Sequence, residues 1–141
     1  MGDATADDEL TSGQRWTEHA REIIENEPRG AFATLLTHDF ALESHRGDHV
    51  AFDRTALLAL YDSMKEVDMH ITGVDVAVAG DHHVLTRRGY VSSFGTTELL
   101  AISGWTAGGR LSRLIEFEVD DLDAALAALE TVAGAPVVRL G

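Results

Sequence analysis

Apolar residues recur every three or four positions in three segments of the first half of the chain, a spacing that gathers them on one face of a helix. Thr11 and Gln14 have the spacing of a capping box, so we predict a first helix from Thr11 to the residue before Pro28. Pro28 suits the first turn of a short second helix, and Asp53 is a favourable cap for a third that ends near Glu66. The apolar face of the second helix would comprise Ala31, Phe32, Leu35 and Leu36.

Strand-like patterns fill most of the remaining chain. Residues 40–45 alternate, with Phe40, Leu42 and Ser44 on one face of a short predicted strand. Four longer runs, rich in β-branched and apolar residues, cover residues 69–79, 82–94, 97–106 and 110–117. Glycine-containing turns separate these runs, and connections this short join only antiparallel neighbours. A four-stranded antiparallel meander is therefore predicted.

A last helix is predicted after the meander. Asp120 is a suitable cap for it, and Leu122 and Leu129 belong to its apolar side. The segment that follows contains an apolar Val137-Val138 pair, which we expect to dock or to form a sheet edge. Helices around a short strand, followed by a long meander, pack as a curved sheet wrapped around helices. The predicted fold class is therefore α+β.

The length and composition indicate a single domain. At 141 residues, with 45% hydrophobic and 25% charged residues, the chain matches one ordinary globular domain. We assign residues 11–133 to this domain, residues 1–10 to a disordered acidic tail and residues 134–141 to a C-terminal tail.

The charge balance and residue usage exclude several classes of function. The formal net charge of −13 and the scattered basic residues oppose nucleic-acid binding. The absence of cysteine removes disulfides, thiolate nucleophiles and thiolate metal sites. No stretch approaches the roughly 20 apolar residues of a membrane span, and the acidic N-terminus is unlike a secretory leader. We therefore expect a cytoplasmic protein that does not act at a membrane.

Three parts of the sequence resemble SnoaL-like domains of the nuclear-transport-factor-two-like superfamily. They are residues 35–46 (LLTHDFALESHR), residues 78–81 (VAGD) and residues 109–126, which contain GRLSRLIEF and DDLDAAL. The resemblance extends from about Gln14 to Glu130. It implies a cone-shaped fold, in which a curved, mainly antiparallel sheet wraps around three N-terminal helices and a short C-terminal helix follows. It also implies an apolar pocket for a small organic molecule.

The resemblance implies fold more directly than function. Members of the superfamily include ketosteroid isomerases, polyketide cyclases, epoxide hydrolases, dehydratases, transport factors and non-catalytic modules. In the isomerase pattern, the proton-shuttling carboxylate corresponds to Ser44, its phenolic oxyanion partner approximately to His19, and a second oxyanion acid to Ala101. None of these three residues matches the pattern, which argues against that isomerase mechanism.

Four ionisable residues are the catalytic candidates: His19, His45, Arg46 and Glu116. His19 shares a predicted helix face with Trp16, where a buried histidine could act as an acid or base or could simply hydrogen-bond to the backbone. Arg46 could bind a carboxylate or enolate oxygen while His45 moves the proton. Alternatively, Arg46 forms a structural ion pair with Glu116 or Glu43.

The ligand-binding candidates are Trp16, Tyr61, Arg88, Tyr90, Ser103 and Trp105. The aromatic rings among them would provide flat apolar walls with polar tips, although such residues are also common in a plain core. Strand alternation places Arg88 and Tyr90 on one face of their strand, and Ser103 and Trp105 on one face of the next. The pattern does not determine which faces are concave.

No metal or cofactor site is predicted. His45 and His49 with Asp48, and the His82-His83 pair, lack further ligands at a known metal-binding spacing. The leading hypothesis is an enzyme independent of metals and cofactors, performing proton-transfer chemistry as a cyclase, dehydratase, isomerase or hydrolase on a hydrophobic metabolite. The alternative is a non-catalytic ligand-binding or dimerisation module. A homodimer formed through the outer sheet face is expected in either case.

Overall fold

The computed structural model describes residues 10–27, 29–47 and 51–140. The helices are α1 (Ser12–Asn26), α2 (Arg29–Ala33), α3 (Arg54–Glu66) and α4 (Leu122–Ala133). The strands are β1 (Leu36–Ser44), β2 (Ala51–Asp53), β3 (His70–Ala79), β4 (His83–Ser92), β5 (Gly95–Trp105), β6 (Leu111–Glu118) and β7 (Val137–Arg139). The acidic tail predicted over residues 1–10 lies outside the described residues, apart from Leu10.

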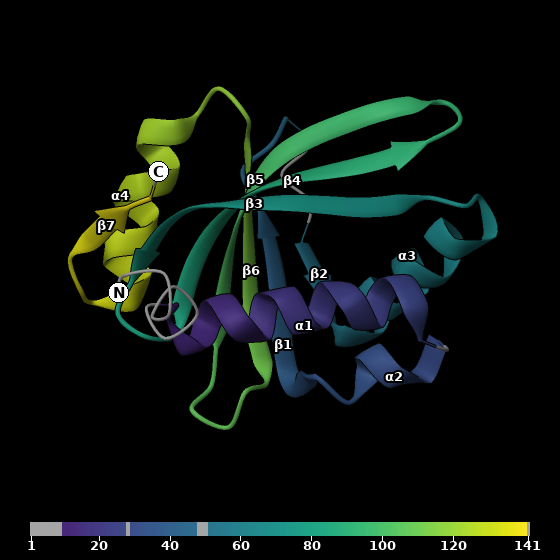
Figure 1. The fold of residues 1–141 in the computed structure, drawn as a ribbon, viewed down its shortest axis with the longest axis horizontal. Helices are drawn as coiled ribbons and strands as arrows, with labels where there is room; N and C mark the ends of the chain where they lie inside the picture. Colours follow the sequence, from purple (N-terminus) through teal and green to yellow (C-terminus); the bar gives the residue numbers. More distant parts are fainter. Residues whose placement is uncertain (1–9, 28, 48–50, 141) are drawn as a thin grey trace, which may run out of the picture.

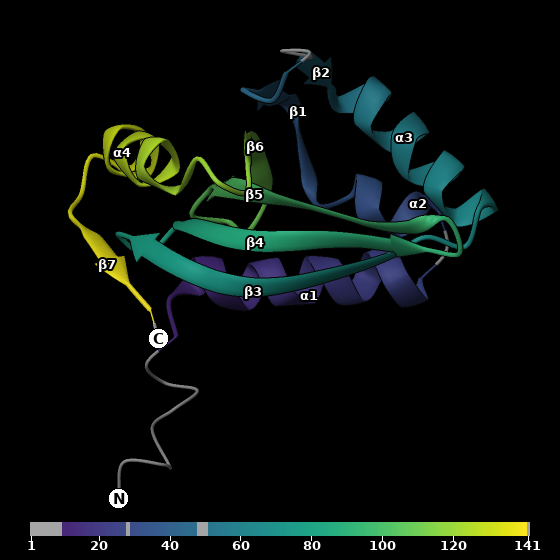
Figure 2. The ribbon, with the colours of Figure 1, turned by 90° about the horizontal axis from the view of Figure 1, so that it is seen from above.

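The strands of the described residues form one seven-stranded sheet in the order β2-β1-β6-β5-β4-β3-β7 (Figure 1). Strands β3 to β6 are the predicted antiparallel meander, and β1 runs parallel to β6. The sheet is curved, with α1 and α4 on opposite sides of it (Figure 2). The α+β fold class, with its curved and mainly antiparallel sheet, is confirmed. No helix within the described residues is long and apolar enough to cross a membrane.

Two hydrophobic clusters fill the two sides of the sheet. On the concave side, residues of α1, α2 and α3 pack against the sheet, and Phe32, Leu57 and Leu114 are among the buried members. On the convex side, α4 covers part of the sheet and buries Leu85 and Leu129. Leu85 of β4 belongs to the convex cluster and Tyr90 packs against the concave one. Every second residue of β4 from Val84 to Tyr90 therefore faces the concave side. Arg88 and Tyr90 therefore face the interior, whereas the intervening residues face outward.

Most predicted helix boundaries agree with the structure. The capping box of Thr11 and Gln14 is present at α1, and the Ala56 N–H donates to Asp53 Oδ1 at 2.9 Å at the start of α3. The cap predicted at Asp120 was wrong by one residue, because Asp121 occupies that position and makes no side-chain capping bond. Helix ends vary by a residue or two when the backbone rather than a side chain defines them.

The prediction that Leu35 and Leu36 continue the second helix was wrong. Helix α2 ends at Ala33, and Leu36 begins β1 opposite Leu111 of β6. The Leu111 N–H donates to the Leu35 carbonyl at 2.6 Å. Pairing with a distant strand therefore takes the backbone groups that a longer helix would have used, and tertiary contact overrides local spacing.

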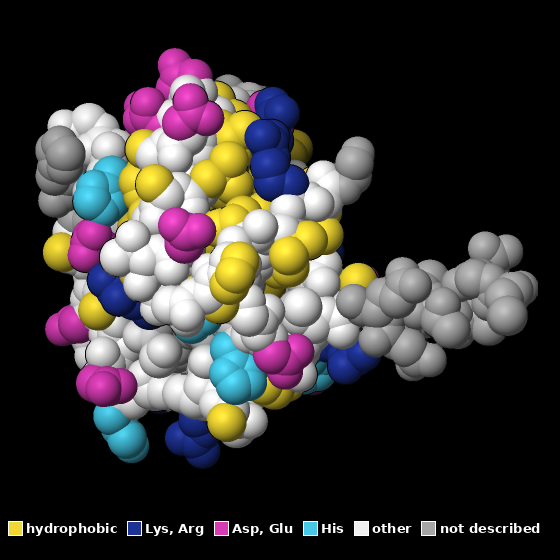
Figure 3. Space-filling view, turned by 90° about the vertical axis from the view of Figure 1, so that its left-hand side faces the viewer, with side chains coloured by type: hydrophobic (Ala, Val, Ile, Leu, Met, Phe, Trp, Pro, Cys, Tyr) yellow, Lys and Arg dark blue, Asp and Glu magenta, His cyan; other side chains and the backbone are white. Residues whose placement is uncertain are grey.

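The C-terminal segment forms a sheet edge, as expected. Strand β7 pairs antiparallel with the last residues of β3, and α4 and β7 together form one end of the molecule. Hydrophobic side chains reach the surface at this end (Figure 3), where Val138 and Leu140 are exposed. Single exposed apolar residues are ordinary on a protein surface and assign no role to this end.

Candidate functional site

An open cavity of about 330 Å³ lies on the concave side of the sheet, which we call the outer cavity. Its apolar wall is formed by Leu42, Phe52, Leu60, Met64, Met69 and Leu99. Its polar lining residues are Ser44, Arg46, Tyr90, Thr97 and Glu116. A mostly apolar cavity of this size with a few polar groups is typical of a site for a small organic molecule.

Four side chains interact with one another, and we call them the polar wall: Tyr61, Arg88, Tyr90 and Glu116. Of these, Tyr90 and Glu116 line the outer cavity. The four come from α3, β4 and β6, so the wall exists only after helix and sheet have packed together. The Arg88 guanidinium interacts with the hydroxyls of Tyr61 and Tyr90 and with the Glu116 carboxylate. A cation, two phenols and a carboxylate thus meet beside an apolar cavity.

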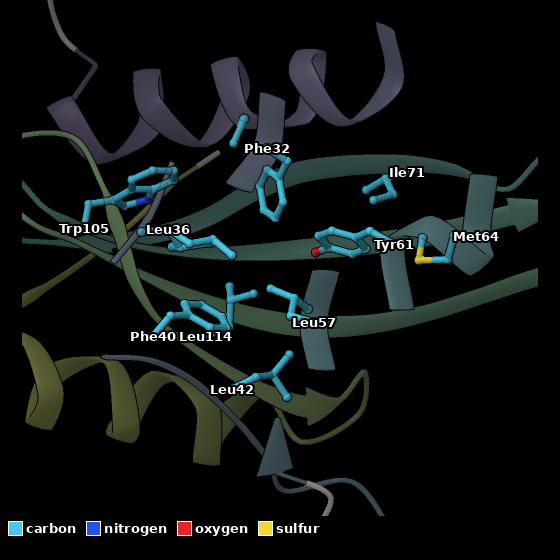
Figure 4. Packing of buried hydrophobic residues seen from close by; sticks show 12 residues of the cluster. Phe32, Leu36, Phe40, Leu42, Leu57, Tyr61, Met64, Ile71, Trp105 and Leu114 are labelled. Carbon is cyan, nitrogen blue, oxygen red and sulfur yellow. The ribbon is translucent and has the colours of Figure 1, made fainter. Parts of the chain in front are cut away.

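Tyr61 is held in place by hydrophobic packing. Its ring makes an edge contact with Phe32 at a centroid distance of 5.0 Å, and Figure 4 shows it between Leu57 and Met64 in the interior. Burial, reinforced by Tyr90 and opposed by Arg88, raises the pKa of the Tyr61 hydroxyl well above its usual range. The hydroxyl therefore stays protonated at any physiological pH and can donate a hydrogen bond.

Arg88 remains a cation inside the protein. Burial acts to lower its pKa, but the interactions with Tyr90, Tyr61 and Glu116 outweigh burial and raise the pKa above its usual range. One of its nitrogens, Nη1, is fully buried and has no hydrogen-bond partner among the described residues. A buried charged donor without a partner is costly, and such groups are rare in proteins.

A second, much smaller hollow of about 20 Å³ is lined by part of the polar wall, and we call it the inner chamber. Tyr61 and Arg88 line it together with residues of α1, α2, β5 and β6. Ser103, Thr86 and Thr17 add hydroxyl groups to a lining that is otherwise mainly apolar. Arg88 and Tyr61 face this chamber, and their partners Tyr90 and Glu116 face the outer cavity.

Strand register places Glu116 of β6 between two residues that the sequence analysis singled out. It lies directly opposite Ser44 of β1 on one side and Ala101 of β5 on the other. The isomerase pattern places its carboxylates at the Ser44 and Ala101 positions, and this chain has one carboxylate on the strand between them. Neighbouring strands lie about 4.8 Å apart, so Glu116 reaches much of the same space.

Arg46 reaches the mouth of the outer cavity but is already paired. Its Nε donates to Glu118 Oε1 at 2.8 Å, and its N–H donates to Ser44 Oγ at 3.2 Å. A structural ion pair of Arg46 is therefore present, and its partner is Glu118. Both partners are partly exposed, so the pair itself adds little stability.

His19 and His45 lie away from both hollows. The prediction that His19 shares a buried helix face was wrong, because His19 is exposed while Thr17 and Ala20 are buried. His45 lies on the convex face, where its ring stacks on Phe117 at 4.8 Å. His45 contacts Phe117, whereas Arg46 lines the outer cavity, so the two side chains do not face the same hollow.

The remaining aromatic candidates lie near the inner chamber. Trp105 and Ser103 line it, whereas Trp16 packs behind Trp105 at 6.1 Å and lines neither hollow. Thr17 was not predicted as a site residue, yet its hydroxyl accepts a hydrogen bond from Trp105 Nε1 at 3.1 Å. Helical spacing alone could have placed Thr17 with Ala20 on the buried face of α1.

Comparison with known proteins identifies the fold. No known family profile matches the sequence, and no curated protein matches it. A computationally designed 17-OHP binder has a TM-score of 0.66 at 11% identity, covering 79% of this chain and 97% of that one. SalBIII, an epoxide hydrolase/cyclase-like enzyme in pyran ring formation of the polyether salinomycin, has a TM-score of 0.62 at 10% identity, covering 74% and 88%.

A third similar structure carries the name of the superfamily. It is an NTF2-like protein of unknown function from Cytophaga hutchinsonii, with a TM-score of 0.57 at 11% identity, covering 77% of this chain and 90% of that one. Identities this low show the fold alone. The cone-shaped α+β fold predicted from the sequence is confirmed, and function has to be argued from the site.

Proposed function

We propose that this protein is an enzyme that binds a hydrophobic small molecule in the outer cavity and performs proton-transfer chemistry at the polar wall. The observation that carries the proposal is the buried Arg88 cation, which interacts with two phenols and a carboxylate beside an apolar cavity. Burying a charge is costly, and clusters of this kind are concentrated at functional sites.

In the proposed reaction, Arg88 and Tyr61 stabilise negative charge on a substrate oxygen. Both are donors at physiological pH, since the pKa of each is raised by its surroundings. Donors fixed in a site that excludes water act more strongly than they would in solution, because they need no reorganisation as charge develops. Tyr90 supports the same oxygen by orienting Arg88.

Glu116 is the proposed acid and base. Its carboxylate takes a proton from the carbon next to a substrate carbonyl. The C–H electron pair becomes the new C=C bond, and the carbonyl π pair moves to the oxygen held by the donors. Return of the proton from Glu116 to carbon completes the reaction. Glu116 is half-buried and lies between Ser44 and Ala101 of the neighbouring strands, which supports this role.

The test is exchange of carbon-bound hydrogen for deuterium. We expect the protein to accelerate deuterium incorporation next to the carbonyl of enolisable ring ketones, such as cyclohexanone and 2-decalone, in D₂O. Glu116→Gln should lower the rate about a hundredfold or more, the usual effect of removing a general base. Arg88→Met should lower it by a similar factor, as loss of an oxyanion donor does.

Matched controls come from the convex face of β4 and β5. Arg87 and Glu98 form an exposed pair at 2.9 Å, so Arg87→Met and Glu98→Gln remove the same groups outside the cavity. Both controls should exchange at the wild-type rate. No acceleration with any ketone, or equal rates for Glu116→Gln and wild type, would refute the proposed chemistry.

Ligand binding without catalysis is the second candidate. Serine at position 44 and alanine at position 101 favour it, because the two carboxylate positions of the isomerase pattern lack an acid here. This function predicts that 2-decalone binds and that its exchange rate stays that of buffer. The exchange assay, run beside a binding titration, therefore separates the two functions.

A further inference from the structure

The mouth of the outer cavity lies between α3 and the β4–β5 hairpin. Among the lining residues that the structure describes, Leu60 of α3 and Thr97 of β5 are the two exposed ones. Met64 of α3 and Leu99 of β5 also line the cavity, and both are buried. A ligand in the cavity therefore remains in contact with water on the side where Leu60 and Thr97 lie.

The β4–β5 hairpin extends beyond the neighbouring strands on both of its sides. Strand β3 pairs with β4 as far as Val91, and β6 pairs with β5 from Leu99 onward. In the described part of the chain, the end of the hairpin is therefore a two-stranded ribbon, in which Ser92 pairs with Gly95 and residues 93–98 are all exposed. A two-stranded hairpin is only marginally stable by itself, so this ribbon can bend without breaking buried contacts.

Phe94 lies at the tip of this ribbon with its side chain 90% exposed, the highest value among the large hydrophobic side chains that the structure describes. The Phe94 N–H donates to Ser92 Oγ at 3.1 Å, and Gly95 has a φ of 132°, which residues with a side chain rarely adopt. The turn that presents Phe94 is therefore well defined. The hairpin tip and the turn after α3 lie at the same end of the molecule (Figures 1 and 2). Because Phe94 is three residues from Thr97, bending of the ribbon toward α3 brings its ring to the mouth of the cavity.

We propose that the end of the β4–β5 hairpin is a lid, which bends toward α3 when an apolar ligand occupies the outer cavity and covers that ligand with the Phe94 ring. The ring then packs against the ligand and Leu60, and the apolar surface that all three remove from water stabilises the closed state. A closed lid keeps water away from a reaction at the polar wall. The inference rests on the proposed function, since it requires a ligand in the outer cavity.

Calorimetric titration of 2-decalone tests the lid with two matched truncations. Phe94→Ala should bind 2-decalone about tenfold more weakly than the wild type, the usual loss when an aromatic side chain no longer covers an apolar ligand. Val74 is also exposed, but it lies on the convex face beside Arg87, so Val74→Ala should bind like the wild type. Because Phe94 is exposed without a ligand, Phe94→Ala should keep the wild-type urea midpoint, which separates a lid from a structural role.

NMR shows directly whether the lid closes. In the complex with 2-decalone, the Phe94 ring protons should give nuclear Overhauser effects to the Leu60 methyl groups and to the ligand. Without 2-decalone, the effects between Phe94 and Leu60 should be absent, because the ring is exposed. The spectrum of Phe94→Ala identifies the ring signals.

Two results would overturn the inference: equal affinities of Phe94→Ala and the wild type for 2-decalone, and a Phe94 ring that contacts neither Leu60 nor the ligand in the complex. Either of them, together with wild-type deuterium exchange in Phe94→Ala, would leave the proposed catalysis intact. Weaker binding by Phe94→Ala, together with a wild-type exchange rate equal to that of buffer, would instead refute the catalysis and support the lid.

Discussion

At the scale of single residues, Thr17 shows how a polar group inside the cone is satisfied. Its hydroxyl donates to the Gly13 carbonyl at 2.7 Å and accepts from Trp105 Nε1 at 3.1 Å. Thr17 and Trp105 are both buried, so water cannot replace either bond. One threonine in α1 therefore fixes the indole that lines the inner chamber, and with it the distance between the helix and β5.

Thr17→Val tests this arrangement. Valine keeps the shape of threonine but leaves the buried indole N–H without an acceptor, which should lower the free energy of unfolding by about 1–3 kcal/mol. Thr131 is a matched control, because its hydroxyl donates to the carbonyl four residues earlier in α4 but is exposed. Urea denaturation of both variants is the measurement. Equal midpoints for Thr17→Val and Thr131→Val would contradict this role of Thr17.

At the scale of elements, Glu25 joins α1 to the free edge of β3. Its two carboxylate oxygens accept from the Ile71 N–H at 2.6 Å and from His70 Nδ1 at 2.9 Å. The first half of β3 lies at the sheet edge, since β7 pairs only with its last residues. A charged group that occupies an edge N–H also hinders pairing with a second chain.

The ion pair between His70 and Glu25 predicts that stability depends on pH. Hydrogen bonding and charge from Glu25, with a contribution from Asp68, raise the pKa of His70, whereas burial, with His82 and Arg113, lowers the pKa of His83. NMR titration of the imidazoles should therefore give a higher pKa for His70 than for His83. Because the His70 pKa is raised on folding, its stabilising effect is complete below the pKa of an unfolded histidine and is lost as pH rises through the folded value.

Glu25→Gln tests whether Glu25 causes the raised pKa of His70. It should bring the pKa of His70 back toward the usual value for histidine. The pKa of His83 should stay unchanged, because burial, His82 and Arg113 shift it, and Glu25 does not. An unchanged His70 pKa in this variant would show that Glu25 does not hold the imidazole in solution.

Most elements could be predicted from the sequence, because their signals are local. Caps, helical spacing and glycine turns located α1, α3 and the meander, since each depends on residues close together in the chain. The boundary between α2 and β1 could not be predicted in this way. It is decided by pairing with β6, more than seventy positions away, as the register of Leu36 with Leu111 shows.

At the scale of the whole molecule, the candidate site depends on which face of each strand is concave. Tyr61, Arg88, Tyr90 and Glu116 could each be named from the sequence, but their meeting in one wall requires the packing of α3 on the sheet. His45 lies outside the candidate site for the same reason, because alternation shows which residues share a face and only the curvature of the sheet decides which face is inside. The resemblance to a known fold implied a curved sheet around helices, but it did not indicate which face of each strand is concave.

The convex face bears on the expected homodimer, which stays a prediction. Helix α4 covers part of that face, where it packs against β3 to β6. The part that a second copy could use lies farther along β3 and β4, where Val74 is 68% exposed beside the Arg87 and Glu98 pair. A dimer through this region would leave the outer cavity open, since the cavity is on the opposite side of the sheet.

Both the proposed reaction and the ligand-binding alternative require that small molecules bind in the outer cavity. Thr97 lines the cavity and Thr96, its neighbour on β5, points to the other face, and both are exposed. Calorimetric titration of 2-decalone into Thr97→Trp and Thr96→Trp compares the same substitution inside and outside the cavity. Binding should be at least about tenfold weaker for Thr97→Trp, because the indole occupies the ligand's space, whereas Thr96→Trp should bind like the wild type. Equal affinities of the two variants would contradict binding in the outer cavity.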